Sequence, residues 1–445
     1  MNLKFIFKYC CLAIISVHFF SCNKISDDSD FKSLPNNEKN KYVISEEQAA
    51  SYVKKMIGTL ISNVETKGTQ LEYTATTCTD YITLNLQKST KSGDTFLDIE
   101  KIPIYTIELT EIKSSKKTTC LFIGDKRIRN PFVAFSENKK FDLSKIPDFD
   151  RFINENLKNY IQAELKRSSV LTKAISPPSG YRYCYEASQY RLEWEQIVGP
   201  LITKISWDQQ IPENDSLPFC QSLGVNMPAG CVSVAISQIL SYHKYPTAGS
   251  YIHPVSGLNT QTSYDWDLMT SIEDAGQSSN VNLRSQVANL HAEVGHKASI
   301  EYFCNSSSTN ILSALSCLYK LGYSNAYTIS NDGNFISTIR NEIDNNRPVY
   351  MKGTDSNVGG HTWVVDGYKA AIIEKGTLYY CFSDNNYSND PDLELYECED
   401  LTEELYFRCK LGWGPYYDVY FATPLLSVAG YDFSSFNMAI VGISL

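Results

Sequence analysis

The chain has 445 residues and a formal net charge of −10, with 43% hydrophobic and 20% charged residues. This length allows two or three domains at the usual ~150 residues per domain. The acidic balance and the lack of a basic patch argue against a nucleic-acid partner. No Cys-x-x-Cys, His-Glu-x-x-His or P-loop motif occurs, so the sequence offers no support for metal or nucleotide chemistry and predicts no cofactor.

The N-terminus has the pattern of an export signal. A weakly basic start precedes an apolar run from Cys10 to Phe20, which is too short to span a bilayer. We therefore predict a lipoprotein signal peptide at residues 1–21 with Cys22 as the acylated residue; an ordinary secretory signal with an incidental cysteine is the alternative. Residues 22–41 are polar and are predicted to be a solvated tether. The expected location is the bacterial cell envelope, as an outer-membrane lipoprotein facing the periplasm or the outside, with the lipid as its membrane contact.

Residues 42–166 show the order helix, strands, helix. Ser45-Glu-Glu-Gln48 is a capping box that starts the first helix. A second amphipathic helix carries apolar residues from Phe149 to Leu165. Strands are predicted between the helices at Tyr81–Leu86, Ile102–Leu109, Thr118–Ile123 and Pro131–Phe135. This order predicts an α+β domain, in which a helical face covers an antiparallel sheet.

Residues 167–180 are polar and contain proline and glycine, which is typical of an exposed linker open to proteolysis. We predict an activation cleavage in this linker. It separates the first domain from a second one at 181–445. If Cys22 is lipidated, the cut also releases the second domain from the membrane unless the first domain holds it.

The stretch from Pro228 to Pro246 predicts a nucleophile on a helix. Apolar residues from Val232 to Leu240 recur at helical spacing, and Pro228 and Gly230 keep the preceding backbone out of the helix, so Cys231 lies in the first turn. Unpaired N–H groups and the helix dipole favour a thiolate there. A small buried apolar cysteine is the alternative.

A thiol nucleophile needs a base, and the chain has six histidines. His243 lies twelve residues along the same helix, roughly 18 Å away, and cannot be the partner. His291 and His296 are expected to be ordinary surface or boundary residues on a helix near 283–294. His361 follows Gly359-Gly360 at the start of an apolar, strand-like run that ends at Tyr368, where glycine lets a substrate approach closely. His361 is therefore the candidate base.

These two motifs resemble the two signatures of the streptopain family, bacterial cysteine peptidases with a papain-like fold. The first is Pro228-Ala-Gly-Cys231-Val with Tyr242-His-Lys-Tyr-Pro246, and the second is Gly360-His361-Thr-Trp-Val-Val-Asp-Gly-Tyr368. The segments 198–214 and 264–269 match the family in the same order. The resemblance implies a catalytic domain with a helical half and an antiparallel β half. It also implies that residues 42–166, by position, are an inhibitory propeptide.

Further roles come from the resemblance alone. It implies that Gln209, in Trp207-Asp-Gln209, donates to the oxyanion, although the neighbouring Gln210 leaves this assignment open. It implies that Trp413 covers the histidine. The strands expected in the second half lie at Pro348–Lys352, Thr362–Tyr368, Leu378–Phe382, Leu405–Cys409 and Asp418–Ala422.

The sequence departs from the family at the late motif Asn-Trp-Gly-Trp-Gly-Gly. Lys410 and Leu411 stand where the motif has Asn and the first Trp. A lysine cannot accept a hydrogen bond from imidazole, so we expect Lys410 to point to solvent and another group to orient His361. Asn385 is a candidate, whereas Asp366 lies five residues along the strand and is expected on the opposite face.

The predicted function is therefore a cysteine endopeptidase that hydrolyses protein or peptide substrates and is made as a zymogen. The loss of the family's Asn raises a second hypothesis, a catalytically weakened papain-fold lipoprotein acting as a binding or inhibitory module. A third is another Cys–His acyl-transfer enzyme, such as a transpeptidase or amidase. Nine cysteines remain beyond the leader, Cys22 and Cys231, and their pairing does not follow from the sequence.

Overall fold

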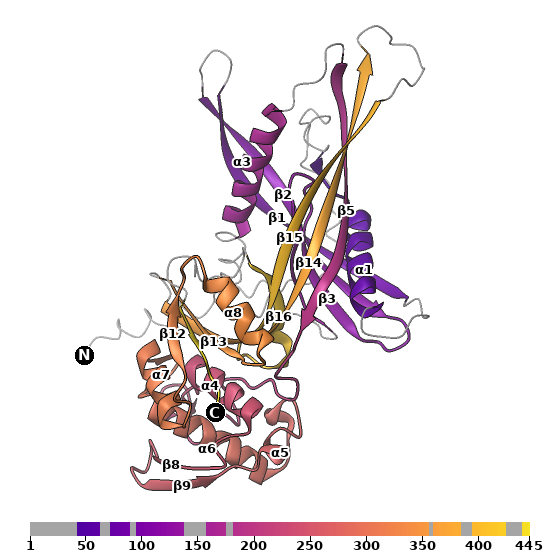
Figure 1. The fold of residues 1–445 in the computed structure, drawn as a ribbon. Helices are drawn as coiled ribbons and strands as arrows, with labels where there is room; N and C mark the ends of the chain where they lie inside the picture. Colours follow the sequence, from indigo (N-terminus) through magenta and orange to yellow (C-terminus); the bar gives the residue numbers. More distant parts are fainter. Residues whose placement is uncertain are drawn as a thin grey trace, which may run out of the picture. The chain divides into compact units, whose positions relative to one another are not determined.

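The computed structural model describes residues 42–62, 72–89, 95–137, 157–174, 181–355, 359–383, 394–423 and 438–445. Within these ranges an 11-stranded antiparallel sheet joins a group of helices (Figure 1). The sheet has the order β1-β2-β3-β4-β16-β15-β14-β13-β17-β12, and β5 also pairs with β14. The predicted α+β fold, with a helical half and an antiparallel half, is confirmed.

The strands of the large sheet have the following bounds: β1 Tyr73–Ser89, β2 Thr95–Glu111, β3 Lys117–Ile123, β4 Phe132–Phe135, β5 Tyr181–Val198, β12 Tyr327–Ser330, β13 Val349–Asp355, β14 Gly359–Ser383, β15 Glu394–Lys410, β16 Asp418–Ala422 and β17 Met438–Val441. Three short hairpins lie outside it: β6 Phe219–Cys220 with β7 Val225–Asn226, β8 Ala248–Ile252 with β9 Asn259–Ser263, and β10 Glu301–Tyr302 with β11 Ser307–Ser308. The helices are α1 Glu46–Ser62, α3 Lys158–Ala174, α4 Cys231–His243, α5 Trp266–Met269, α6 Val281–Lys297, α7 Ile311–Lys320 and α8 Phe335–Asp344.

The capping box starts α1 as predicted. The Gln48 backbone N–H donates to the Ser45 hydroxyl at 3.3 Å, and the Ser45 N–H donates to the Gln48 side-chain oxygen at 3.1 Å. These reciprocal bonds satisfy two backbone donors at the helix start and fix where the chain turns into the helix.

The two N-terminal helices cover opposite faces of the sheet (Figure 1). On β2, Ile102 and Ile104 share a core with α3, whereas Ile107 and Leu109 share a core with α1. Successive side chains of a strand point to opposite faces, so the apolar residues of β2 lie on both faces of the sheet. Each face therefore needs a helix that packs over it and excludes water.

Strand β4 joins the N-terminal strands to those that carry the candidate site. Phe135 pairs with Tyr420 of β16, and their rings stack with centroids 5.0 Å apart. One core contains residues of α1 and β3 together with Tyr406 and Tyr420. Residues 42–166 and 181–445, which the sequence predicts to be separate domains, therefore contribute strands to one continuous sheet and side chains to one core.

Strand β14 is longer than the sequence predicts. The two short strands expected at Thr362–Tyr368 and Leu378–Phe382 are parts of one strand of 25 residues. Polar residues such as Lys369 interrupt the apolar pattern, but Lys369 is buried and paired with Glu137 at 3.0 Å. Both β5 and β15 pair along β14, so its backbone is satisfied on both edges.

Two further expectations change at the helices. Helix α3 continues to Ala174, so residues 167–174 of the predicted linker are helical, while 175–180 lie outside the described residues. His291 on α6 is fully buried and not at the surface, because α4 packs against α6 and the ring contacts Trp207. Its Nδ1 lies 2.8 Å from the Val287 carbonyl, and burial lowers its pKa to about 4.

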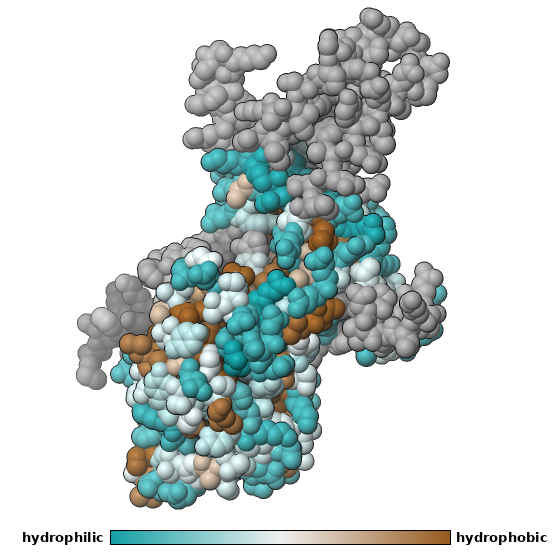
Figure 2. Space-filling model, viewed as in Figure 1, coloured by the Kyte–Doolittle hydropathy of each residue, from teal (hydrophilic) through white to brown (hydrophobic). Residues whose placement is uncertain are grey.

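A disulfide between Cys220 and Cys304 links β6 to the loop between β10 and β11. Among the described residues, no helix is both long enough and apolar enough to cross a membrane. On the face shown in Figure 2, hydrophobic residues lie in separate small groups among hydrophilic ones.

Candidate active site

Helix α4 begins at Cys231, as the sequence predicts. Gly230 precedes it with φ 87°, a backbone conformation that residues other than glycine rarely adopt. A Cβ at this position would also lie 2.0 Å from the Ser307 hydroxyl. The first helical bond runs from the Val234 N–H to the Gly230 carbonyl, so the N–H groups before Val234 have no partner inside the helix. N–H groups at a helix start favour a negative charge beside them.

Cys231 has the electrostatic surroundings of a nucleophile. Burial by itself raises the thiol pKa, but a hydrogen bond and the charge of His361 outweigh burial, and polar groups of Thr362 add to their effect. The net result lowers the pKa of Cys231 from 9.0 to about 7. A thiol with this pKa is substantially ionised at neutral pH.

Three other free cysteines give a useful contrast. Cys120, Cys317 and Cys409 are fully buried, and burial raises the pKa of each, that of Cys317 to about 12. Cys231 is partly exposed. Among these four thiols, Cys231 alone combines access with a lowered pKa.

His361 is held from two sides. Its Nε2–H donates to the backbone carbonyl of Leu411 at 3.0 Å, which leaves Nδ1 for the Cys231 sulfur. The Trp413 ring stacks on the imidazole with centroids 4.4 Å apart and planes at 23°. The sequence gives no sign of the Leu411 carbonyl, because backbone acceptors leave no trace in side-chain identity.

Lys410 does not point to solvent, and that expectation is wrong. Its side chain is 1% exposed, and its Nζ lies 2.6 Å from an Asp418 oxygen. The Ser206 hydroxyl donates to the same carboxylate at 2.8 Å. Lys410 pairs directly with Asp418 across β15 and β16, so the hairpin register predicts this ion pair once both strands are assigned.

Asp366 also belongs to this charged cluster and not to the histidine. Arg408 donates through Nη1 to both Asp366 oxygens, at 2.7 and 2.6 Å, and through Nη2 to Asp418 at 3.2 Å. Burial acts to lower the pKa of Arg408, but the two carboxylates outweigh it and raise that pKa. Two buried cations thus balance two buried carboxylates beside the loop that carries the late motif.

Gln209 lies on the segment that runs beside the nucleophile. Its carbonyl accepts a hydrogen bond from the Ala229 N–H at 2.9 Å, two residues before Cys231. Gln209 is partly buried, whereas Gln210 is exposed. This difference favours Gln209 for the oxyanion role. The bond from Ala229 positions the Gln209 backbone, and the role of its side chain stays a prediction.

Two predicted residues, Asn385 and Cys22, lie outside the described residues. Within the described ranges, no group of three or more His, Cys, Asp or Glu side chains is arranged to hold a metal ion.

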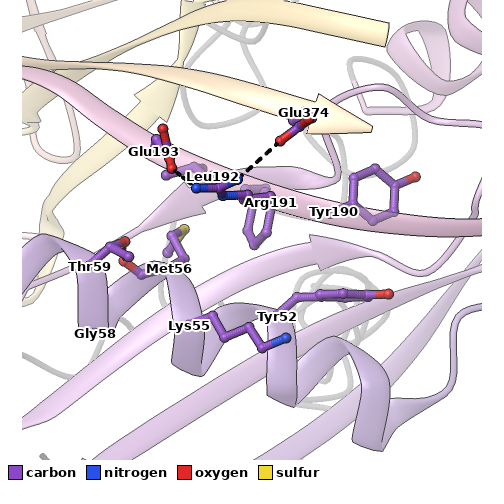
Figure 3. A pocket seen from close by; sticks show the side chains of 11 residues that line it. Tyr52, Lys55, Met56, Gly58, Thr59, Tyr190, Arg191, Leu192, Glu193 and Glu374 are labelled. Atoms are coloured by element: carbon purple, nitrogen blue, oxygen red, sulfur yellow. Dashed lines mark hydrogen bonds and ion pairs between the residues drawn. The ribbon is translucent and has the colours of Figure 1, made fainter. Parts of the chain in front are cut away.

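A cavity of about 680 Å³ lies elsewhere, between α1 and β5 (Figure 3). Arg191 in its wall pairs with Glu193 and Glu374. Tyr52, Lys55 and Met56 of α1 form the opposite side. The lining contains no cysteine or histidine, so this cavity has no part in the Cys231 site.

Comparison with known proteins supports the resemblance found in the sequence. Residues 207–421 match the model of the Peptidase C10 family. This segment includes Gln209, Cys231, His361 and Trp413, the residues to which the sequence resemblance points.

Streptopain of Streptococcus pyogenes serotype M1 is 27% identical over 275 residues, which cover 55% of this chain and 64% of streptopain. The thiol protease/hemagglutinin PrtT of Porphyromonas gingivalis is 24% identical over 281 residues, 58% of this chain and 30% of that protein. The matches thus span less than two thirds of these relatives.

Two solved structures are also similar. A prointerpain A fragment of Prevotella intermedia covers 83% of this chain and 99% of the fragment, with 17% identity and a TM-score of 0.48. Active interpain A of the same organism covers 61% of this chain and 100% of its own, with 20% identity and a TM-score of 0.41.

Proposed function

We propose that this protein is a cysteine endopeptidase that acts through a Cys231 thiolate and a His361 imidazolium. The main support is the hydrogen bond between these two side chains, which, together with the charge of His361 and the polar groups of Thr362, outweighs burial and lowers the thiol pKa to about 7. The Peptidase C10 match over residues 207–421 supports the same chemistry.

The reaction has two stages. The thiolate attacks the scissile carbonyl carbon, and the oxyanion accepts hydrogen bonds from the Cys231 N–H at the helix start and from the Gln209 side chain. His361 protonates the leaving amine as the C–N bond breaks, which leaves a thioester on Cys231. Water, deprotonated by His361, then hydrolyses the thioester and releases the acid. Trp413 keeps solvent from one face of the imidazole.

The departure at Lys410 does not remove the orienting contact in this proposal. The Leu411 carbonyl accepts the hydrogen bond from His361 Nε2–H that the Asn of the family motif would otherwise accept. The second candidate function is a catalytically weakened binding module. It would differ from a peptidase in having a reactive Cys231 that does not turn over a protein substrate.

The test compares the parent protein with Cys231→Ala in casein hydrolysis and in labelling by a cysteine-peptidase affinity inhibitor. We expect one label per parent molecule and casein turnover, and neither with Cys231→Ala, because Cys120, Cys317 and Cys409 are buried and burial raises the pKa of each. Cys78→Ala is the matched control, since Cys78 is also partly exposed. Labelling without turnover would support the binding module, and turnover in Cys231→Ala would refute the proposal.

We further propose that residues 42–166 are an inhibitory prodomain, that the activating cut falls within 167–180, and that Cys22 carries a lipid in the cell envelope. The helical state of 167–174 favours a cut in the remaining part of the linker. Because β4 pairs with β16, the cleaved prodomain is expected to stay bound until these strands separate.

The same pair of proteins tests maturation. Mass spectrometry of the N-terminal and mature fragments should find acylated Cys22, and a cut within 167–180 in the parent protein but not in Cys231→Ala. A processed Cys231→Ala protein would mean that another enzyme performs the cut. A mature chain that keeps residues 42–166 covalently attached would contradict the zymogen proposal.

A further inference from the structure

A partly buried lysine lies close to the nucleophile and has no role in the chemistry described above. Lys352 of β13 is the cross-strand partner of Thr362 on β14. Paired residues of adjacent strands place their side chains on the same face of the sheet. Thr362 is the residue whose polar groups act on the Cys231 sulfur, so Lys352 and Thr362 share the face towards α4.

The ammonium group is held beside the residues that flank Cys231. Its Nζ donates to the Thr309 carbonyl at 3.2 Å. The Ser307 side chain, two residues earlier, lies against Gly230, which directly precedes Cys231. One short segment therefore contacts both the start of the nucleophile's helix and the lysine head group.

Electrostatic coupling agrees with this placement. Burial lowers the pKa of Lys352, and the negative charge of Cys231 partly offsets the effect. A cation whose charged form is penalised by burial gains most from a carboxylate placed against it.

No carboxylate among the described residues supplies that partner. None lies within 4.0 Å of the Lys352 Nζ in the part of the chain that the structure describes, whereas Lys369 and Lys410 of the same sheet pair with Glu137 and Asp418 at 3.0 and 2.6 Å. An ammonium has three donors, and for Lys352 the Thr309 carbonyl uses one of them. Lys352 is also partly exposed, so a molecule from outside can reach it.

We propose that Lys352 binds the carboxylate of an acidic side chain in the peptide substrate, close to the scissile bond. This inference rests on the proposed peptidase function and specifies its substrates. Ion-paired hydrogen bonds of this kind are among the stronger side-chain contacts, so an acidic residue at the matching position increases kcat/KM.

The experiment uses fluorogenic peptides in matched sets that differ only by Glu, Gln or Lys, at each of three positions on either side of the scissile bond. We expect one position at which Glu exceeds Gln by about tenfold in kcat/KM, as for a partly exposed charge-assisted contact. In Lys352→Met this ratio falls to about one. In Lys352→Glu the preference moves to a Lys peptide of the same series.

Lys320→Met is the matched control, because Lys320 also donates to a backbone carbonyl, that of Lys297 at 2.9 Å, but is exposed. It should keep the Glu-to-Gln ratio. Equal cleavage of Glu and Gln peptides at every position, or a ratio that Lys352→Met leaves intact, overturns the inference and leaves the peptidase standing. Absence of cleavage of all peptides together with absence of Cys231 labelling overturns both.

Discussion

Replacing His361 with alanine is expected to reduce kcat/KM for a peptide substrate by about 100- to 10,000-fold, the range for loss of general acid–base catalysis. Two effects combine. The leaving amine loses its proton donor, and burial then acts on the Cys231 thiol without the opposing hydrogen bond and charge of His361, so the thiol pKa rises. The measurement is steady-state kinetics at neutral pH on protein quantified by absorbance.

The matched control is His296→Ala, since His296 is an exposed histidine on α6. It should retain the parent activity within about twofold, as surface substitutions have little effect on stability or structure. A His361→Ala protein that retains more than a tenth of the parent rate would remove the histidine from the mechanism.

Lys410→Met is expected to have the largest effect on stability. It leaves Asp418 buried without its closest cation, and breaking a buried ion pair from one side costs about 3–5 kcal/mol. Because Arg408 and Ser206 still contact Asp418, we expect a loss of about 3 kcal/mol in the free energy of unfolding. Urea denaturation measures it.

The double variant Lys410→Met/Asp418→Asn removes both charges and should recover at least half of that loss, because no unpaired carboxylate remains. Lys244→Met is the control, since Lys244 pairs with Asp267 at the surface, where such pairs contribute little. A change below about 0.5 kcal/mol in Lys410→Met would mean that the ammonium points to solvent after all.

These substitutions address different parts of one arrangement. The late-motif loop supplies a carbonyl to His361 through Leu411, and the neighbouring Lys410 fixes that loop through Asp418. An Asn at position 410, as in the streptopain motif, would find the Nε2–H of His361 already bonded to the Leu411 carbonyl. The same substitution removes the ion pair between Lys410 and Asp418. We therefore expect no gain in rate from Lys410→Asn.

The elements that carry the chemistry follow directly from local sequence signals. Helical spacing after Gly230 places the start of α4 at Cys231, and the glycine pair before His361 marks the start of β14. Both signals are local: a conformation that requires glycine, and an apolar period that matches one element. The capping box at Ser45 and Gln48 belongs to the same class.

The expectations that failed depend on what packs over an element from elsewhere in the chain. Lys410 is polar and lies near a turn, so a solvent-facing side chain is the natural prediction. Ser206, from a segment some two hundred positions earlier, covers it. His291 is buried for the same reason, because α4 packs over its helix. Charge pairs that satisfy buried groups become visible only when strand register is known.

The length of the central strands also lies beyond local signals. Strand β5 was not predicted, although Tyr190, Leu192 and Trp194 alternate with polar residues and all three are buried. Alternation of apolar and polar residues over a short stretch indicates a strand, but it does not predict that β5 pairs along most of β14.

The central claim is that Cys231 is held as a thiolate by His361, and the pH dependence of its alkylation tests this most directly. The rate of carbamidomethylation by iodoacetamide is measured from pH 5 to 10, by mass spectrometry of the peptide that contains Cys231. Since only the thiolate reacts, we expect a rate that rises with a midpoint near pH 7 in the parent protein. A midpoint at or above the ordinary value of 9.0 in the parent protein would contradict it.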